Sequence, residues 1–375
     1  MTQNAMKRLR GASLTALVLA TGCGGLAPAD TEAMVSQDSS AAAEQALQGG
    51  VSPGEFSFRQ ETFGGNGRTC ETCHGMATGT VSPEELQARY QQNPQEPMFR
   101  ALDSDDGKTG TSYQRLLMNA TILVSLPLPS NTRVLGSLDN QVTLRRGIPS
   151  TLDTPALDPV LMSDGRAPSL TVQAHGAIMG HAQATRQPTA SELANIASFE
   201  QTLFSSLAMK SYAETGMAPE LPEGTTDSEK RGRAFFRPEG ACGQCHSGPL
   251  LNETGPANFL GQPQGSRFSN AFVSETNVGL NPVHTFVIKR PDGLVDVQVS
   301  PDPGRFLITG RKEDFNFFKI GSLRNIKNTA PYFHDNSAKT LEQLMEHYGG
   351  ALATQQGVLL TQQDKADIVA WMKLL

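Results

Sequence analysis

The chain has 375 residues and a formal net charge of −6. This length allows two domains with cores of their own. The slightly acidic balance and the lack of Lys/Arg runs argue against a surface that binds nucleic acid. Only five cysteines occur, and four of them stand in two short CxxCH units.

The first 23 residues have the composition of an export signal. Lys7, Arg8 and Arg10 precede an apolar segment, 12–20, that is too short to cross a bilayer. The segment runs into LATGC (19–23), which resembles a lipoprotein signal, and ordinary cleavage nearby is the alternative. We expect a periplasmic protein that contacts a membrane only through a lipid at Cys23, or otherwise a secreted one. The small, polar residues 24–50 predict a flexible linker.

Two CxxCH units follow, in RTCETCHGM (68–76) and GACGQCHSG (240–248). Two cysteines one helical turn apart, directly followed by His, are typical of covalent c-type haem. A redox-active CxxC pair and half of a zinc site are the alternatives. Zinc would need further Cys or His ligands, and no second CxxC accompanies either unit. The sequence therefore predicts two haem c groups, held by Cys70, Cys73, His74, Cys242, Cys245 and His246.

The two units occupy the same place in an internal repeat. His246 follows His74 at an offset of 246 − 74 = 172. SDGRAPSL (163–170) matches HDNSAKTL (334–341) at an offset of 171, and ASELANIASFEQTL (190–203) matches QQDKADIVAWMKLL (362–375) at 172. A shared period predicts duplicated units. We expect a mainly α protein with two tandem class I cytochrome c-like domains, 51–224 and 225–375, and long irregular loops.

The predicted elements keep one order in both domains. A helix-prone stretch precedes CxxCH, as in 227–236, and an amphipathic helix closes each domain. Thr189 with Glu192, and Thr361 with Asp364, form capping-box patterns at the starts of these closing helices. The alternating segment 283–300 with its PDG turn predicts a small β-hairpin in the second domain.

The function depends on the side of each iron opposite the CxxCH histidine. Two strong axial ligands give an electron carrier, whereas an open position permits chemistry with peroxide or oxygen. In the second domain, 340–350 offers Met345, His347 and Tyr348 as ligands. The matching stretch of the first domain places Ala177 opposite Tyr348, at 348 − 177 = 171. We therefore expect one closed haem and one open haem.

The stretch FKIGSLRNIKNTAPYFHDNSAKTLEQLMEHY (318–348), together with SDGRAPSLTVQA (163–174) and the two CxxCH units, resembles the bacterial di-haem cytochrome c peroxidase family, which includes MauG. The resemblance covers 51–375. Tyr348 stands where typical peroxidases have Met and the MauG branch has Tyr. The resemblance thus implies Tyr348 as the sixth iron ligand of the C-terminal haem. His347 is the rival, because neighbouring helical residues point about 100° apart.

The resemblance also implies that peroxide binds at the N-terminal haem. Gln173 matches a pocket glutamine of the family, but the catalytic glutamate ten residues later is Gln183 here. His181 is therefore the candidate acid–base residue in its place. The alternative ligands of this iron are Met179, His175 and His181. The stretch directly after the first CxxCH offers only Met76.

Two other family features are altered. The tryptophan that lies between the haems is Ser163 here, and the only tryptophan is Trp371. The family's interdomain calcium takes carbonyls at positions matching Thr329 and Pro331, whereas its asparagine ligand aligns near Gly147. A calcium site at Thr329 and Pro331 is thus implied with one ligand missing.

Three arginines, Arg145, Arg146 and Arg166, could pair with haem propionates or carboxylates, or be solvated. The leading interpretation is an exported di-haem oxidoreductase that reduces hydrogen peroxide with electrons relayed between its haems. A small redox protein, either a cytochrome or a cupredoxin, would supply the electrons. The alternatives are an electron-transfer cytochrome without peroxidase activity and a MauG-like oxidase of a protein or organic substrate.

Overall fold

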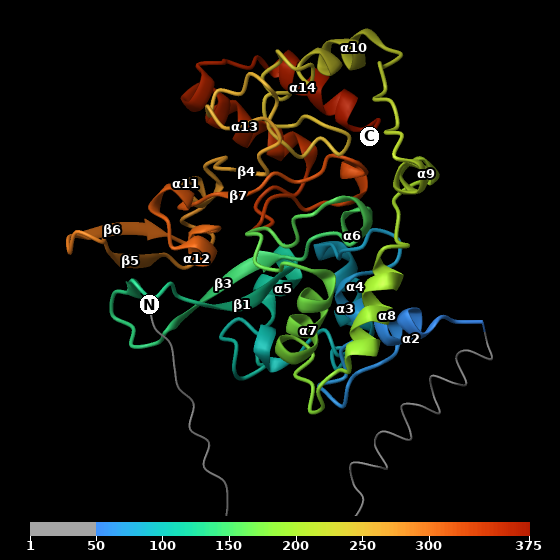
Figure 1. The fold of residues 1–375 in the computed structure, drawn as a ribbon, viewed down its shortest axis with the longest axis vertical. Helices are drawn as coiled ribbons and strands as arrows, with labels where there is room; N and C mark the ends of the chain where they lie inside the picture. The colour runs from blue at the N-terminus through green and yellow to red at the C-terminus, as the bar shows by residue number, and fades with distance from the viewer. Residues whose placement is uncertain (1–49) are drawn as a thin grey trace, which may run out of the picture. The chain divides into compact units, whose positions relative to one another are not determined.

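Helices and short strands alternate with long irregular segments in the computed structural model, which describes residues 50–375 (Figure 1). The predicted export signal, Cys23 and nearly all of the predicted linker lie outside the described residues. Within the described part of the chain, no helix combines the length and the apolar character needed to cross a membrane. All of the described residues belong to one structural unit.

The first half contains the first CxxCH unit and several short helices around it in the chain. In chain order its elements are α2 (Pro53–Arg59), α3 (Cys70–Cys73), α4 (Pro83–Gln92), η1 (Ala101–Asp103), α5 (Gln114–Asn119), β1 (Thr121–Pro127), β2 (Thr132–Val134), β3 (Gln141–Gly147), α6 (Thr154–Leu157), α7 (Leu170–Gly180), α8 (Ala190–Glu200) and α9 (Leu207–Thr215).

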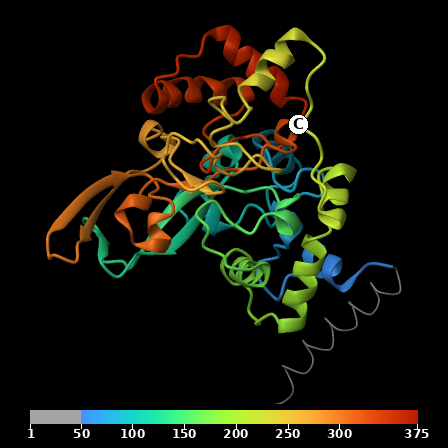
Figure 2. The same cartoon turned by 45° about the horizontal axis from the view of Figure 1, so that its top comes forward.

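The second half repeats part of this order, with one helix before its CxxCH unit and two longer helices near its end. Its elements are α10 (Asp227–Ala234), β4 (Phe268–Ser269), α11 (Val273–Thr276), β5 (His284–Lys289), β6 (Val295–Ser300), α12 (Phe306–Thr309), η2 (Lys312–Asp314), β7 (Phe318–Lys319), η3 (Ile326–Asn328), α13 (Leu341–Gln356) and α14 (Gln362–Met372). Figure 2 shows α10, α13 and α14 together at one end, with α9 on the connection from α8 to α10.

The helix before each CxxCH unit crosses the closing helix of the same half, and a glycine lies at the point of contact. A Cβ atom on Gly54 of α2 would lie 2.1 Å from the carbonyl oxygen of Asn195 on α8. A Cβ atom on Gly232 of α10 would lie 1.9 Å from the carbonyl oxygen of Asp367 on α14. Only glycine permits such a close approach of two backbones. Asn195 and Asp367 are related by the same offset as His74 and His246, so the crossing itself follows the repeat.

Aromatic pairs accompany both crossings. The ring centroids of Phe58 and Phe199 are 5.3 Å apart, and those of Phe236 and Trp371 are 4.4 Å apart. The predicted capping boxes at the starts of α8 and α14 are both confirmed. The apolar faces of these helices lie in two hydrophobic clusters, with Ile196 and Ile368 fully buried. The domain boundary at 224–225 stays a prediction.

Helices dominate as predicted, but strands are more numerous than the single hairpin that we expected. The hairpin of β5 and β6 is confirmed. However, β2 from the first half pairs with β5, which gives a three-stranded sheet in the order β2-β5-β6. In addition, β1 and β3 pair antiparallel from Thr121↔Gly147 to Pro127↔Gln141. The expectation that this region is irregular is wrong, because its alternating apolar side chains pack into one cluster with the hairpin.

Candidate haem-binding site

Both CxxCH units line one cavity of about 1140 Å³. Its lining includes Cys70, Cys73 and His74 from the first half, and Cys242, Cys245 and His246 from the second. Pockets for a single small molecule span roughly 300–1,000 Å³. The cavity is therefore larger than one such pocket, and it brings the two predicted attachment sites into one continuous space.

The CxxCH histidines have the orientation of iron ligands. His74 Nδ1 lies 2.8 Å from the carbonyl oxygen of Gly79, and His246 Nδ1 lies 2.7 Å from that of Leu251. A histidine that donates one ring N–H to a carbonyl presents the other nitrogen to a metal. Burial lowers the pKa of both histidines, which keeps them in the neutral, metal-binding form.

The four cysteines are free thiols that suit covalent attachment better than redox exchange. Burial raises the pKa of the Cys242 thiol to about 12 and that of Cys245 to about 11. It also raises the pKa values of Cys70 and Cys73. A redox-active CxxC pair instead needs a cysteine whose pKa is lowered. Together with the cavity, this chemistry fits a haem c at each unit.

One face of α7 lines the first half of the cavity. It presents Gln173, Ala177 and His181, the last being the residue that caps α7. Residues four positions apart lie on the same side of a helix. The structure therefore brings together the predicted catalytic residues Gln173 and His181 around the small side chain of Ala177, in the cavity that His74 also lines.

The equivalent face of α13 lines the second half. It presents Leu344, Tyr348 and Leu352, which correspond in the repeat to Gln173, Ala177 and His181. The two halves of the cavity thus differ in chemistry. In the first half, the helix presents two polar side chains around a small alanine. In the second half, it presents a tyrosine flanked by apolar side chains.

The other candidate ligands of the first iron do not line this cavity. His175 is exposed, and its Nε2 lies 2.9 Å from Oε1 of Gln187. Met179 packs against a hydrophobic cluster, and Met76 is 39% exposed. Gln183 is also exposed, where it accepts a hydrogen bond from Asn66. His181 is the one member of the predicted set Met179, His175 and His181 that lines the cavity.

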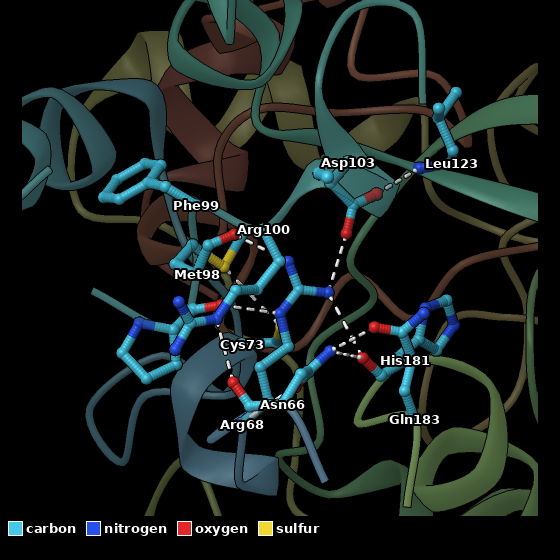
Figure 3. Close-up of polar contacts among 12 residues, drawn as sticks. Asn66, Arg68, Cys73, Met98, Phe99, Arg100, Asp103, Leu123, His181 and Gln183 are labelled. Carbon is cyan, nitrogen blue, oxygen red and sulfur yellow. Dashed lines mark hydrogen bonds and ion pairs between the residues drawn. The ribbon is translucent and has the colours of Figure 1, made fainter. Parts of the chain in front are cut away.

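The end of α7 is held against the segment that precedes the first CxxCH unit (Figure 3). Asn66 Nδ2 donates to the carbonyl oxygen of His181 at 3.0 Å. Arg68, which is almost fully buried, donates to Oδ2 of Asp103 at 2.7 Å and to the same carbonyl at 3.4 Å. Burial lowers the pKa of His181, and the cations Arg68 and Arg166 add to this effect while Asp103 opposes it. His181 is therefore neutral at neutral pH.

In the second half, Tyr348 lines the cavity and its neighbour His347 does not. His347 Nε2 lies 2.7 Å from the carbonyl oxygen of Ala271, so this ring nitrogen already has a hydrogen-bond partner. Burial raises the pKa of Tyr348 above its usual range. The phenol is thus neutral by itself, and a ferric ion would be needed to favour the tyrosinate. The role of Tyr348 as an iron ligand stays a prediction.

The predicted arginines divide between two environments. Arg146 is buried, binds Asp302 through two hydrogen bonds of 2.7 and 2.9 Å, and also contacts Asp164. Arg166 lies 3.0 Å from Asp164 and lines the cavity. Arg145 is half-buried and has no ion pair within residues 50–375. The pairing with carboxylates is thus observed for Arg146 and Arg166.

Sequence reasoning missed several buried carboxylates, among them Asp302 and Glu200. Asp302 follows β6 in a Pro-rich turn, where nothing in the sequence pattern marks its distant partner Arg146. Glu200 ends α8, lines the cavity and is 4% exposed. The repeat contained a signal for Glu200. The equivalent position in the second half is Met372, so an acidic residue stands in the first half where the second half has an apolar one.

The positions that depart from the family pattern lie in different parts of the structure. Ser163 lines the cavity, and its carbonyl oxygen accepts a hydrogen bond from Lys319 N at 2.7 Å. Trp371 lies in the core, where it donates to the carbonyl oxygen of Pro222. Thr329 and Pro331 line the cavity. A Cβ atom on Gly147 would lie 2.1 Å from Oδ1 of Asn336, so an asparagine at 147 has no room here.

Curated relatives are cytochrome c peroxidases. Cytochrome-c peroxidase IdrP2 of Denitromonas iodatirespirans is 30% identical over 157 residues, which are 40% of this chain and 40% of the relative. Cytochrome c551 peroxidase of Nitrosomonas europaea is 31% identical over 147 residues, 39% of this chain and 34% of the relative. Each match therefore spans well under half the length of the relative. No protein-family model matches the chain.

A solved structure shares the fold. The crystal structure of a MauG-like protein associated with microbial copper homeostasis superposes with a TM-score of 0.50 at 20% sequence identity. The superposition covers 85% of this chain and 86% of that one, so the likeness extends over both halves. The chain is thus similar in sequence to cytochrome c peroxidases over part of its length, and similar in fold to a MauG-like protein over both halves.

Proposed function

We propose that the protein is an exported di-haem c-type cytochrome that reduces hydrogen peroxide in the periplasm. The haem attached at Cys70 and Cys73 is the peroxide site, and the haem attached at Cys242 and Cys245 stores and relays electrons. A small redox protein, a cytochrome or a cupredoxin, supplies two electrons, which with two protons convert hydrogen peroxide to two water molecules. The observation that carries the proposal is the difference between the cavity faces of α7 and α13.

The residues of the first half suit this reaction. Haem iron, when bound, supplies the electrons and the site for peroxide. Ala177 leaves space beside that site, since a methyl group cannot ligate iron. The Gln173 amide donates a hydrogen bond to a peroxide oxygen and thereby orients it. Neutral His181 accepts a proton from one peroxide oxygen and returns it to the oxygen that leaves as water.

The residues of the second half suit an electron store. Tyr348 would hold the second iron as a ligand, which would exclude peroxide from it and favour its ferric state. The apolar neighbours Leu344 and Leu352 keep water from this side. In the second half, the rings of Phe318 and His334 stack with centroids 3.6 Å apart and line the cavity. This pair offers an aromatic route for electrons in a chain that has Ser163 in place of the family's tryptophan.

Other parts of the proposal rest on sequence alone. They are the export signal, the lipid at Cys23 and a calcium ion bound by the carbonyls of Thr329 and Pro331. Membrane fractionation of wild type and Cys23→Ser checks the lipid anchor. Calcium content of the purified protein checks the ion.

One observation favours a second candidate, an electron-transfer cytochrome without peroxidase activity. His181 lines the same cavity as His74, and the positive charge of either imidazole would lower the pKa of the other. His181 could then close the first iron as its sixth ligand. In that case the chain would hold two fully ligated irons.

Electron paramagnetic resonance of the ferric holoprotein decides between the two. The peroxidase predicts one high-spin and one low-spin haem, with the high-spin signal lost on addition of hydrogen peroxide. Two low-spin haems that do not respond to peroxide would overturn it in favour of the cytochrome. Mass spectrometry of the intact protein is the control, since it must show two covalent haem groups in the same sample.

A further inference from the structure

Glu200 is a buried carboxyl group that the proposed reaction does not use. It is the last residue of α8, is 4% exposed and lines the cavity. Its Oε2 atom has no hydrogen-bond partner within residues 50–375. Burial of an unpartnered polar group costs free energy, so such a group in a folded protein calls for an explanation.

The internal repeat shows that packing does not require a carboxyl at this place. The equivalent residue in the second half is Met372, the last residue of α14. Met372 is also buried and also lines the cavity. An apolar side chain therefore fills the same position in the other half, beside the other haem attachment site.

No nearby cation of the described part of the chain compensates the Glu200 carboxylate. Helix α8 packs against α2, α6 and α7. On α2, Glu55 and Arg59 pair with each other at 2.8 Å, and α6 has no titratable side chain. On α7, His175 contacts Gln187. Burial is the single cause that raises the pKa of Glu200, to about 7.

Two other titratable groups lie close to the Glu200 end of α8. Asp153, which precedes α6, accepts two hydrogen bonds from Ser205 and also lines the cavity. The second group is Cys70, because the negative charge of Glu200 contributes to raising the pKa of its thiol. Cys70 would become a thioether on attachment of haem, so Glu200 would then lie near one of the two attachment points.

We propose that Glu200 couples the uptake of one proton to the reduction of the haem attached at Cys70 and Cys73, and that the haem at Cys242 and Cys245, beside Met372, lacks this coupling. The proposal rests on the covalent haem of the proposed function, but not on peroxide turnover.

The coupling follows from charge. The Glu200 carboxylate is stabilised beside ferric haem, whose iron–porphyrin core is positive, and loses this stabilisation when an electron neutralises the core. Glu200 then takes a proton from solvent, and an O–H bond forms at its carboxyl. The electron comes from the redox protein donor. Oxidation releases both the electron and the proton, and no other bond changes.

Redox titration of the purified holoprotein at several pH values tests this proposal. We expect the reduction potential of one haem to fall as pH rises through the neutral range, by up to about 59 mV per pH unit, since a tenfold change corresponds to about 59 mV for one electron. The potential of the other haem should be nearly independent of pH. In Glu200→Gln and Glu200→Met, the slope of the first haem should disappear while the haem content stays at two.

Two further variants serve as controls for this test. Glu84→Gln removes an exposed carboxyl of α4 and should leave both potentials and the slope unchanged. Glu200→Asp keeps a carboxyl and should keep the slope. Wild-type potentials that do not change with pH, or a slope that persists in Glu200→Gln, would overturn the proposal. A slope that behaves as expected in a protein without peroxide turnover would sink the peroxidase function and leave this inference standing.

Discussion

Arg146 and Asp302 form a buried, bidentate ion pair between segments that are far apart in the chain. The two hydrogen bonds measure 2.7 and 2.9 Å, and both side chains are almost fully buried. Arg146 also contacts the buried carboxylate of Asp164. These charges raise the pKa of Arg146, so it stays protonated and holds two acidic groups from both halves.

Removal of this arginine should destabilise the protein strongly. Arg146→Ala leaves Asp302 buried without its arginine partner and Asp164 with Arg166 alone, and breaking a buried pair in this way costs about 3–5 kcal/mol. We expect a loss of that size in the free energy of unfolding, measured by denaturant titration of the holoprotein. Arg145→Ala is the matched control, because Arg145 is half-buried and has no ion pair within residues 50–375, and it should change stability by under about 0.5 kcal/mol. Equal losses in the two variants would contradict the argument.

The two glycine crossings make a second prediction about stability. Gly54→Ala and Gly232→Ala place a methyl group within van der Waals overlap of a backbone carbonyl oxygen, so the paired helices must move apart. Overpacking of this kind costs about 1–3 kcal/mol. The free energy of unfolding of each variant, compared with wild type, gives the measurement.

Gly350→Ala is the control for the glycine variants. Gly350 lies within α13, and a Cβ atom there would meet nothing within 4 Å. Alanine is preferred to glycine inside a helix by roughly 0.5–1 kcal/mol, so this variant should be neutral or slightly more stable. A destabilised Gly350→Ala together with unaffected Gly54→Ala would show that close packing is not the cause.

Local patterns in the sequence predicted the local parts of this fold. The CxxCH units, the capping boxes at Thr189 and Thr361 and the β5–β6 hairpin each depend on residues close together in the chain. The repeat then predicted which segments correspond. The pairing of β2 with β5 and of Arg146 with Asp302 was not predicted, because both join segments from different halves of the chain and neither has a spacing rule.

The choice among the candidate ligands was within reach of the sequence. Helical residues turn by about 100° each, so positions two residues from Ala177 point away from it by about 200°, whereas positions four away point along it. If Ala177 faces the haem, Gln173 and His181 face it too, and His175 and Met179 do not. In the structure, Gln173 and His181 line the cavity with Ala177, whereas His175 and Met179 do not.

Substitution of Tyr348 tests the ligand assignment in the second half. Tyr348→Phe keeps the ring in the cavity but removes the phenol oxygen, so the spectrum of the His246 haem should change and its reduction potential should rise as tyrosinate ligation is lost. Optical and EPR spectra of the ferric protein give the measurement. His347→Phe removes a ring bound to the Ala271 carbonyl and should leave both haem spectra unchanged. An unaltered spectrum in Tyr348→Phe would show that the tyrosine only packs there.

Substitution of the polar residues on α7 should reduce peroxide turnover and leave haem content unchanged. A positioned acid–base group contributes about 10²–10⁴-fold to rate, so we expect His181→Ala to lose turnover within that range. Gln173→Leu should also lose turnover, because peroxide is no longer oriented by a hydrogen bond. His175→Ala is the control on the same helix, since His175 is exposed and bound to Gln187, and it should retain wild-type turnover. Full activity in His181→Ala would exclude His181 as the proton carrier.

The pH dependence of turnover provides a separate test of His181. Burial lowers the pKa of His181, so the imidazole is neutral at pH 7 and becomes protonated only below the ordinary histidine value of about 6.5. A base must be neutral to accept a proton. Turnover should therefore be constant through neutral pH and fall on acidification, once His181 is charged. This acid limb should be absent from the residual activity of His181→Ala but present in His175→Ala, and a limb that is identical in His181→Ala and wild type would assign the titration to another group.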